Sequence, residues 1–227
     1  MIDFSPSLNR LGVFFKNIGY FPSFTTRYVV MNILQIGCNN CEDDVFVFFQ
    51  ENEKDVNEIV LIDAIPECVD IARKKYDFTS KAKFENLAIT PLDIGPNKTL
   101  TLYKEQDNPI SDLTSVNKDF IIEQRSEFGP PPELVSFETQ IASLNSVFKR
   151  YPETTHLFID IEGLDVVTLF SLENKYYEKL NLLVFEFIHT DGFKSCGGPK
   201  LQAFLNYLSS FGFKHFTTHN FNLIASK

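Results

Sequence analysis

The chain has 227 residues, of which 44% are hydrophobic, and its formal net charge is −9 with an isoelectric point near 5.0. This length and composition predict one substantial folded core and exclude a disordered protein. Because an acidic surface repels phosphate backbones, we expect no nucleic acid as a partner.

The stretch over residues 1–30 mixes aromatic and polar side chains and lacks the basic start, unbroken apolar run and cleavage site of a signal peptide. No apolar stretch in the chain approaches the ~18 residues of a membrane span. We therefore expect a cytoplasmic protein without a membrane span. Residues 1–30 are interpreted as an N-terminal extension or cap that packs on a single domain over residues 31–227.

From Asn32 the sequence alternates between strand-like and helix-like patterns. Short apolar runs predict strands, and apolar residues at helical spacing predict helices. Pro66 stands at a first helical position and is followed by early acids and late lysines, as is typical of a helix. The predicted strands lie over 31–37, 58–65 and 82–89, and the predicted helices over 42–54 and 66–76.

The middle of the chain, from about Thr90 to Thr139, is less regular. An alternating pattern over 98–104 predicts an edge strand, and the Gly-Pro-Pro-Pro run over 129–132 predicts a loop. Apolar residues at Ile141, Leu144, Val147 and Phe148 predict a helix over 136–151.

The C-terminal part returns to the alternating pattern. Strands separated by helices predict βαβ units, and hence an α/β fold with a mostly parallel sheet and helices on both faces. Two short closing strands around a His219-Asn220 turn would add an antiparallel hairpin. The predicted strands are 156–163 and 181–188, the predicted helices 163–180 and 199–213, and the hairpin 214–227.

The loop after the first strand is the predicted ligand site. In an open α/β sheet, ligands lie beyond the carboxyl ends of the strands. Gly37 permits a sharp turn or a close approach of backbone to ligand, and Asn39 tolerates a left-handed conformation. Asp63 ends the second strand, which is where an acid holds ribose hydroxyls in nucleotide-binding sheets.

The same loop argues against a dinucleotide. The phosphate-binding fingerprint of NAD-binding sheets has three glycines, whereas this loop has only Gly37. Gln35 and the acids at 42–44 also disfavour a polyphosphate. A nucleoside with a cationic or zwitterionic tail fits better, and S-adenosyl-L-methionine is such a ligand.

A second interpretation of the loop rests on Cys38 and Cys41, which form a C-x-x-C pair typical of zinc or thiol redox sites. A structural zinc site needs four ligands, and the sequence holds no second C-x-x-C pair. Neither His156 nor His189 has a neighbour at metal-ligand spacing. We therefore expect two ordinary cysteines beside a tight turn, and we assign no metal.

Several stretches in order resemble the FkbM-type methyltransferases. "LQIGCNNCEDD" resembles the first motif of that family, "VLIDAIPECVDIARKKY" its second strand and helix, and "ENLAIT" its third strand. "ISDLTSV" resembles a serine-containing loop, "FIDIEGLDVVTL" the acidic D-x-E-G signature, and "LLVFEF" the strand that follows. The matches span residues 32–188, most of the chain.

The resemblance implies the class I methyltransferase fold, a Rossmann-like sandwich with a seven-strand sheet, and S-adenosyl-L-methionine as cofactor. Two positions depart from the family pattern. Cys41 replaces a glycine, which strains the backbone by about 1 kcal/mol if its φ is positive, and Ile65 replaces a glutamate. The cofactor-binding residues implied together with the loop argument are Gln35, Gly37, Asn39, Asp63, Ala64, Ile65, Ala88, Ser111 and Asp160.

The expected reaction is methylation of a hydroxyl on a small-molecule or carbohydrate acceptor. This reaction needs alignment of the acceptor and removal of its proton. Asp160 is assigned to the methionine part of the cofactor, Glu162 and Glu186 lie near the acceptor, and His189 has a pKa suited to a base. Asp160 and Glu162 share a face if their segment stays extended.

Other functions remain open at the level of sequence. Asp160, Glu162 and Asp165 could instead hold a divalent cation, since hard cations prefer oxygen ligands. The chain could be a degenerate member that binds cofactor without catalysis, or a nucleotide-dependent oxidoreductase of similar architecture. The sequence assigns neither the acceptor nor an oligomeric state.

Overall fold

A computed structural model describes residues 30–227 except 93–94, 96–97, 109–113, 127–128, 192–194 and 196. The predicted N-terminal extension therefore lies outside the described residues, apart from Val30, and the division into extension and single domain stays a prediction. No helix in the described part of the chain is long and apolar enough to cross a membrane.

The main sheet has seven strands in the order β3-β2-β1-β7-β8-β10-β9. The first five in this order pair in parallel, and β10 pairs antiparallel with both β8 and β9. The predicted parallel sheet with an antiparallel C-terminal hairpin is confirmed. The strands are β1 (Met31–Ile36), β2 (Val56–Asp63), β3 (Ala82–Asn86), β7 (His156–Ile159), β8 (Leu182–Glu186), β9 (His215–His219) and β10 (Asn222–Ser226).

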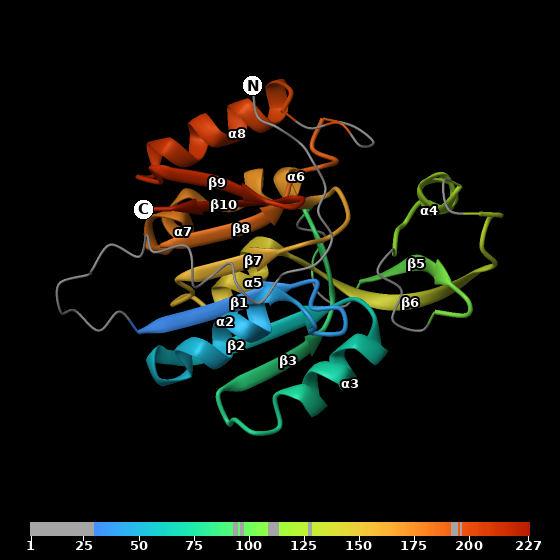
Figure 1. Cartoon of the computed structure of the whole chain (residues 1–227), viewed down its shortest axis with the longest axis horizontal. Helices are drawn as coiled ribbons and strands as arrows, with labels where there is room; N and C mark the ends of the chain where they lie inside the picture. Colours follow the sequence, from blue (N-terminus) through green and yellow to red (C-terminus); the bar gives the residue numbers. More distant parts are fainter. Residues whose placement is uncertain are drawn as a thin grey trace.

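Helices cover both faces of this sheet, as predicted (Figure 1). Successive side chains of β1 point to opposite faces of the sheet: Ile33 packs with the helices of one face and Leu34 with those of the other. One face carries α2 (Asp44–Asn52), with a short 3-10 turn η2 (Glu53–Asp55), and α3 (Pro66–Lys75). The other carries α5 (Leu144–Arg150), α6 (Asp165–Phe170), α7 (Asn174–Lys179) and α8 (Pro199–Ser210).

A second sheet of three strands stands beside the main one. It has the order β4-β6-β5, and Figure 1 shows β5 and β6 together with α4 projecting to one side of the main sheet. Ala88, Leu102 and Ile141 form its own small core, against which Ala64 of the main domain packs. These elements are β4 (Ala88–Thr90), β5 (Thr99–Glu105), β6 (Leu134–Ser143) and α4 (Lys118–Arg125); we call them the side lobe.

The predicted helix over 136–151 is wrong in its first half. Residues 134–143 form β6, in which Thr139, Ile141 and Ser143 are buried and Glu138 and Gln140 are exposed, the period of a strand. The helix begins only after Ser143, whose hydroxyl accepts from the backbone N–H of Ser146 and caps α5.

Two further predicted elements are interrupted. The strand expected over 82–89 divides at Leu87, because β3 pairs with β2 while β4 pairs with β6 of the side lobe. The helix expected over 163–180 consists of α6 and α7, separated by residues 171–173. The first break takes the chain from the main sheet to the side lobe, and the second separates two helices on the same face of the main sheet. A continuous apolar pattern reveals neither break.

Candidate active site

The turn after β1 brings the chain against the end of β7. Gly37 has a φ of 78°, and a Cβ built on it would lie 1.9 Å from the carbonyl oxygen of Asp160. Its backbone N–H donates to Ile62 over 2.8 Å, which ties the turn to β2. The predicted need for glycine here therefore has two causes, a left-handed backbone and a close approach to a neighbouring strand.

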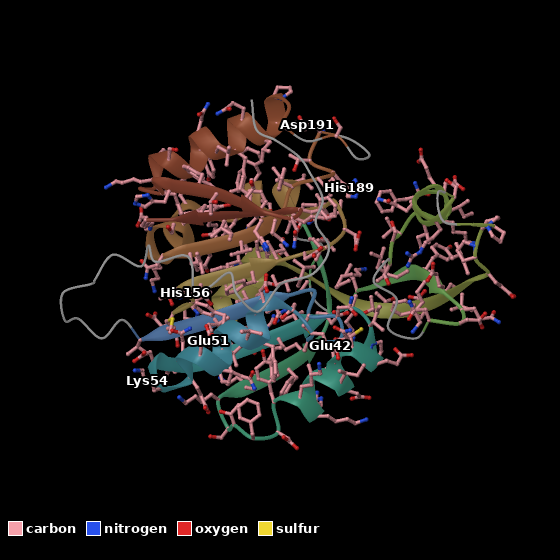
Figure 2. All side chains as sticks on the ribbon, in the orientation of Figure 1. Glu42, Glu51, Lys54, His156, His189 and Asp191 are labelled. Carbon is pink, nitrogen blue, oxygen red and sulfur yellow. The ribbon has the colours of Figure 1, made fainter. Side chains whose placement is uncertain are left out.

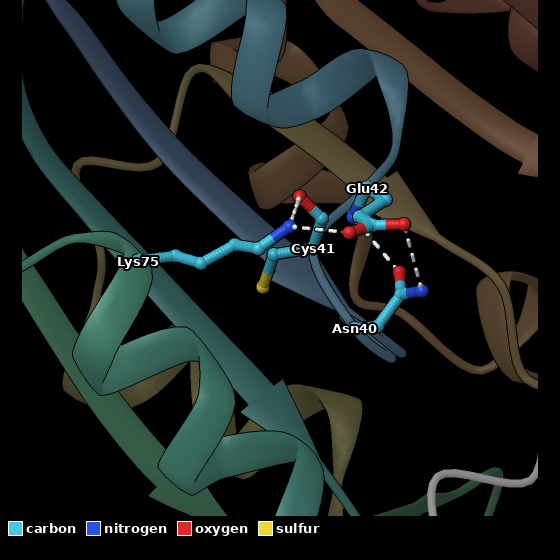
Figure 3. A network of polar contacts seen from close by, with 4 residues as sticks. All are labelled: Asn40, Cys41, Glu42 and Lys75. Carbon is cyan, nitrogen blue, oxygen red and sulfur yellow. Dashed lines mark hydrogen bonds and ion pairs between the residues drawn. The ribbon is translucent and has the colours of Figure 1, made fainter.

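The loop that follows is held by its own polar groups and by α3. Lys75 of α3 lies 3.4 Å from the Cys41 carbonyl and 3.3 Å from a Glu42 carboxylate oxygen, and Asn40 Oδ1 accepts from the Glu42 N–H (Figure 3). Asn39 has a φ of 43°, so the left-handed conformation that this residue tolerates is observed. Cys41 has a φ of 54°, so the condition for backbone strain at this position is met. These contacts fix the loop before any ligand arrives.

The two cysteines of the loop are buried and free. Cys41 donates its N–H to the Cys38 carbonyl over 2.9 Å, so the pair flanks a tight turn, as expected. The hydrogen bond to Cys41, and secondly burial, raise the pKa of the Cys38 thiol, which keeps that sulfur protonated and unreactive. Among the described residues, no three His, Cys, Asp or Glu side chains form a group that could hold a metal ion.

Gln35 of β1 holds the residue that caps α2. Its side chain is buried, and its amide nitrogen donates to Asp43. Asp43 in turn accepts from the N–H groups of Val45 and Phe46 and caps α2. Gln35 does not line the cavity described below, so its predicted contact with a cofactor stays a prediction, while its contact with the helix cap is observed.

Asp63 joins the ends of β1 and β2. One carboxylate oxygen accepts from the Asn39 N–H over 2.9 Å and the other from the Ile65 N–H over 2.8 Å. Burial raises the pKa of Asp63, and these N–H donors partly offset that rise. A carboxylate oxygen has more than one lone pair, so both oxygens can accept a further hydrogen bond from a ligand in the cavity.

Asp160 and Glu162 follow β7 in a turn rather than an extended segment. Glu162 has a φ of 54° and Gly163 a φ of 84°, so the condition under which the two acids would share a strand face is not met. Both side chains nevertheless line the cavity. Asp160 opens into it, yet protein surrounds the carboxyl on its other sides, and this desolvation raises the pKa of Asp160 to about 6.

Two further acids lie behind Asp160. Burial, and secondly the charge of Asp160, raise the pKa of Glu186 to about 8, and the Oε2 atom of Glu186 has no hydrogen-bond partner among the described residues. Asp165 is buried, accepts from the Ile161 N–H over 3.3 Å, and has a pKa raised mainly by its burial. Neither Glu186 nor Asp165 lines the cavity.

His189 lies beyond the end of β8 and meets the side lobe. Its Nε2 atom is 3.0 Å from the amide nitrogen of Gln124, and the Phe120 ring packs edge-on with the centroids 5.6 Å apart. Gly163 allows this packing, since a Cβ there would come within 2.9 Å of the His189 Cβ. His156, at the opposite end of the strands, is buried and remote from this group (Figure 2).

These residues surround a cavity of about 680 Å³, a size that suits a small-molecule ligand. It lies at the carboxyl ends of β1, β2 and β7 and is closed on one side by the side lobe. The predicted cofactor and catalytic residues that line it are Gly37, Asn39, Asp63, Ala64, Ile65, Ala88, Asp160, Glu162 and His189. Ser111, also predicted, lies outside the described residues.

The side lobe supplies lining residues beyond the individual site residues that the sequence predicted. Leu100 and Leu102 come from β5, Thr114 to Asn117 from the segment before α4, and Phe120 from α4 itself. The alternating pattern over 98–104 indicated the strand but not its partner. Nothing in the sequence around Phe120 distinguishes it from the many other phenylalanines of the chain.

No protein-family model matches the sequence, and no curated protein matches it. The structure is similar to that of methyltransferase FkbM from Methylobacillus flagellatus KT, with a TM-score of 0.53 and 12% identity, over 92% of this chain and 46% of that chain. It also matches the CMeT domain of citrinin polyketide synthase (TM-score 0.42, 10% identity, 89% and 48% covered). A third match is the methyltransferase domain of bacterial CtHen1 (TM-score 0.43, 10% identity, 86% and 90% covered).

The likeness to FkbM shows the fold. The chain has the α/β methyltransferase fold, with a seven-stranded sheet and an antiparallel C-terminal hairpin. It spans about half the length of the FkbM chain. The low sequence identity restricts this likeness to architecture, so activity must be argued from the residues around the cavity.

Proposed function

We propose that this chain is an S-adenosyl-L-methionine-dependent methyltransferase that acts on a hydroxyl group of a small molecule or carbohydrate. The observation that carries this proposal is the cavity at the carboxyl edge of the sheet, where the Gly37 turn, the Asp63 carboxylate and Asp160 meet. In a fold of this kind, that edge is where ligands bind.

The polar groups of the cavity suit a nucleoside with a cationic tail. The Oδ1 atom of Asn39 is buried and has no hydrogen-bond partner among the described residues, so a ligand donor would satisfy it. Asp63 offers acceptors for ribose hydroxyls, and Asp160 offers a carboxylate for an ammonium group. Ala64, Ile65 and Ala88 would form the apolar surface beside the base, and Ser111 keeps its proposed place among the cofactor-binding residues.

The same lining disfavours a dinucleotide. None of the described residues around the cavity is Lys or Arg, whereas Asp63, Asp160 and Glu162 are acids. A pyrophosphate would meet carboxylates without a compensating cation or a glycine-rich cradle. We therefore do not propose a nicotinamide-dependent oxidoreductase.

The chain's own residues would bind the cofactor, orient the acceptor and remove the proton of its hydroxyl. The cofactor, when bound, supplies an electrophilic methyl group, so that a C–O bond forms on the acceptor as the C–S bond breaks and its electron pair stays on sulfur. Glu162 would take the proton of the acceptor hydroxyl, whereas His189, considered above as a base, would orient that hydroxyl. Because the Gln124 amide nitrogen donates, His189 Nε2 accepts, which in the neutral ring places the hydrogen on Nδ1.

Glu186 would act through Asp160 rather than on the acceptor. It lies outside the cavity lining, and the charge of Asp160 contributes to its raised pKa. A protonated Glu186 leaves Asp160 as the ionised partner for the ammonium group. We therefore propose that Glu186 supports the reaction indirectly, by keeping Asp160 ionised.

Calorimetric titration with S-adenosyl-L-methionine and its demethylated product tests the proposal. We expect both to bind the wild-type protein, and Asp160→Asn to weaken binding about 10-fold or more, because a charge-assisted hydrogen bond contributes about 1.5–3 kcal/mol. Methyl transfer to a panel of hydroxyl acceptors should be lost in that variant. Glu51→Gln, an exposed acid on α2, is the matched control and should bind normally.

Two outcomes would contradict this proposal in different ways. A folded wild-type protein that binds neither molecule would exclude the cofactor assignment. Binding without transfer to any acceptor would favour the alternative, a degenerate protein that retains only the cofactor. The position of Cys41, whose side chain is buried away from the cavity lining, gives no support to that alternative.

A further inference from the structure

The strand order divides the cavity into two halves. Asp63 ends β2 and Gly37 follows β1. On the other side of β1, Glu162 and Leu164 follow β7 and His189 follows β8. If the nucleoside lies over the ends of β1 and β2, as the proposed function requires, the acceptor must lie over the ends of β7 and β8. We call this part the acceptor half.

The acceptor half presents apolar side chains to the cavity. Leu164, at the start of α6, is 40% exposed, and Val116 of the side lobe, which lines the same cavity, is 49% exposed. The ring of Phe120 lines the same region and packs against His189. A single exposed leucine or valine is ordinary, but several around one concave surface mark a place where an apolar ligand is desolvated.

The charge of the cavity restricts the acceptor further. No lysine or arginine is found among the described lining residues, and the acids Asp160 and Glu162 border the acceptor half. A carboxylate or phosphate on the acceptor would be repelled and left without a partner as water is excluded. A bare carbohydrate would place hydroxyl groups against Val116, Phe120 and Leu164, where they lose hydrogen bonds to water.

We propose that the acceptor half binds an uncharged molecule whose reacting hydroxyl is carried on an apolar body that lies on Val116, Phe120 and Leu164. This inference rests on the proposed function and narrows its acceptor from any hydroxyl compound to an apolar one. The hydroxyl end points toward Glu162 and His189, and the apolar body lies between α6 and the side lobe.

Three probes that differ in one property each can test this specificity by calorimetry, with and without the demethylated cofactor. 2-Naphthol has an apolar body and no charge, 6-hydroxy-2-naphthoate adds a carboxylate, and methyl glucoside has hydroxyls without an apolar body. We expect 2-naphthol to bind about 10-fold or more tightly than either of the other two, because charge burial and unmet hydroxyls both disfavour them.

Variants then locate the binding. Leu164→Ser and Phe120→Ser should each weaken 2-naphthol binding about 5-fold or more, since each removes apolar contact area. Val167→Ser is the matched control, because Val167 is 50% exposed on the same helix as Leu164 and does not line the cavity. It should leave binding unchanged.

The inference is overturned if the carboxylate probe or methyl glucoside binds as tightly as 2-naphthol, or if Leu164→Ser and Phe120→Ser behave like Val167→Ser. Cofactor binding is measured separately in the same proteins. If the protein binds cofactor but shows no preference for 2-naphthol, only this inference is contradicted. If the protein binds no cofactor, the proposed function is contradicted.

Discussion

Two carboxyl groups, Asp160 in the cavity lining and Glu186 outside it, lie where burial disfavours their charged form. Asp160 and Glu186 are carboxyl groups whose pKa values are raised to about 6 and about 8, in both cases mainly by desolvation. A cationic ligand group would relieve this conflict, because it offers the charge that the protein does not supply. In the apo protein the same conflict opposes folding whenever these groups are ionised.

The stability of the protein should therefore depend on Glu186. Its pKa in the folded state, about 8, lies above its ordinary value of 4.5, so its contribution to stability is fully present below pH 4.5. The contribution is lost as the pH rises toward about 8. We expect Glu186→Gln to raise the free energy of unfolding near pH 9 by on the order of 2 kcal/mol, and to change it little near pH 4.

Urea unfolding at several pH values measures this difference. Glu51→Gln, on the exposed face of α2, serves as the control and should shift stability equally little at every pH. A Glu186→Gln protein whose advantage over the wild type is the same at low and high pH would show that Glu186 does not titrate as described.

At the scale of single elements, the boundary between a strand and a helix depends on the residue at the junction. Ser143 stands where β6 becomes α5, and it is the last partner of β4 in the parallel pair as well as the cap of the helix. The apolar pattern runs through this junction without a break, so the change of structure depends on the cap and on pairing with β4. A defect at the cap should weaken both elements.

Ser143→Ala should lower the free energy of unfolding by about 1 kcal/mol, which is the usual cost of losing a helix-capping hydroxyl. Ser143→Thr retains the hydroxyl and should cost less. Ser136→Ala, at an exposed position of the same strand, should be nearly neutral. Equal destabilisation by Ser143→Ala and Ser136→Ala would mean that the cap has no special part in this junction.

At the scale of the whole molecule, the side lobe and the main sheet meet around the cavity. Ala64 packs into the core of the side lobe, and Phe120 and Gln124 of α4 contact His189 beyond β8. A ligand between them would touch both parts at once and add contacts that the apo protein lacks. Its binding should therefore stabilise the side lobe as well as the loops of the main sheet.

Hydrogen exchange can detect this coupling. Addition of the demethylated cofactor together with 2-naphthol should slow amide exchange in the loop over 37–43 and in residues 114–120. Exchange in β9, at the far edge of the main sheet, should not change. Protection confined to 37–43 would indicate that the ligand does not bridge the two parts.

Local sequence signals predicted those parts of the protein that depend on neighbours in the chain. The apolar runs of β1, β2, β7 and β8, the apolar spacing of α2 and Pro66 at the start of α3 specify strands and helices by themselves, and a parallel sheet follows from their alternation. Gly37 and Asp63 could be located because turn chemistry and strand ends are local features. The order of these elements also places the two residues at one edge of the sheet.

Contacts between distant segments could be decided only by the tertiary structure. Whether residues 134–143 form a strand depends on pairing with β4 and β5, which supply the hydrogen bonds that a helix would otherwise make internally. The placement of Phe120 and Gln124 against His189, some 65 residues away in the chain for Gln124, likewise depends on how the side lobe packs. Sequence thus determined the strand ends that carry the acids, and packing decided which apolar surface faces them.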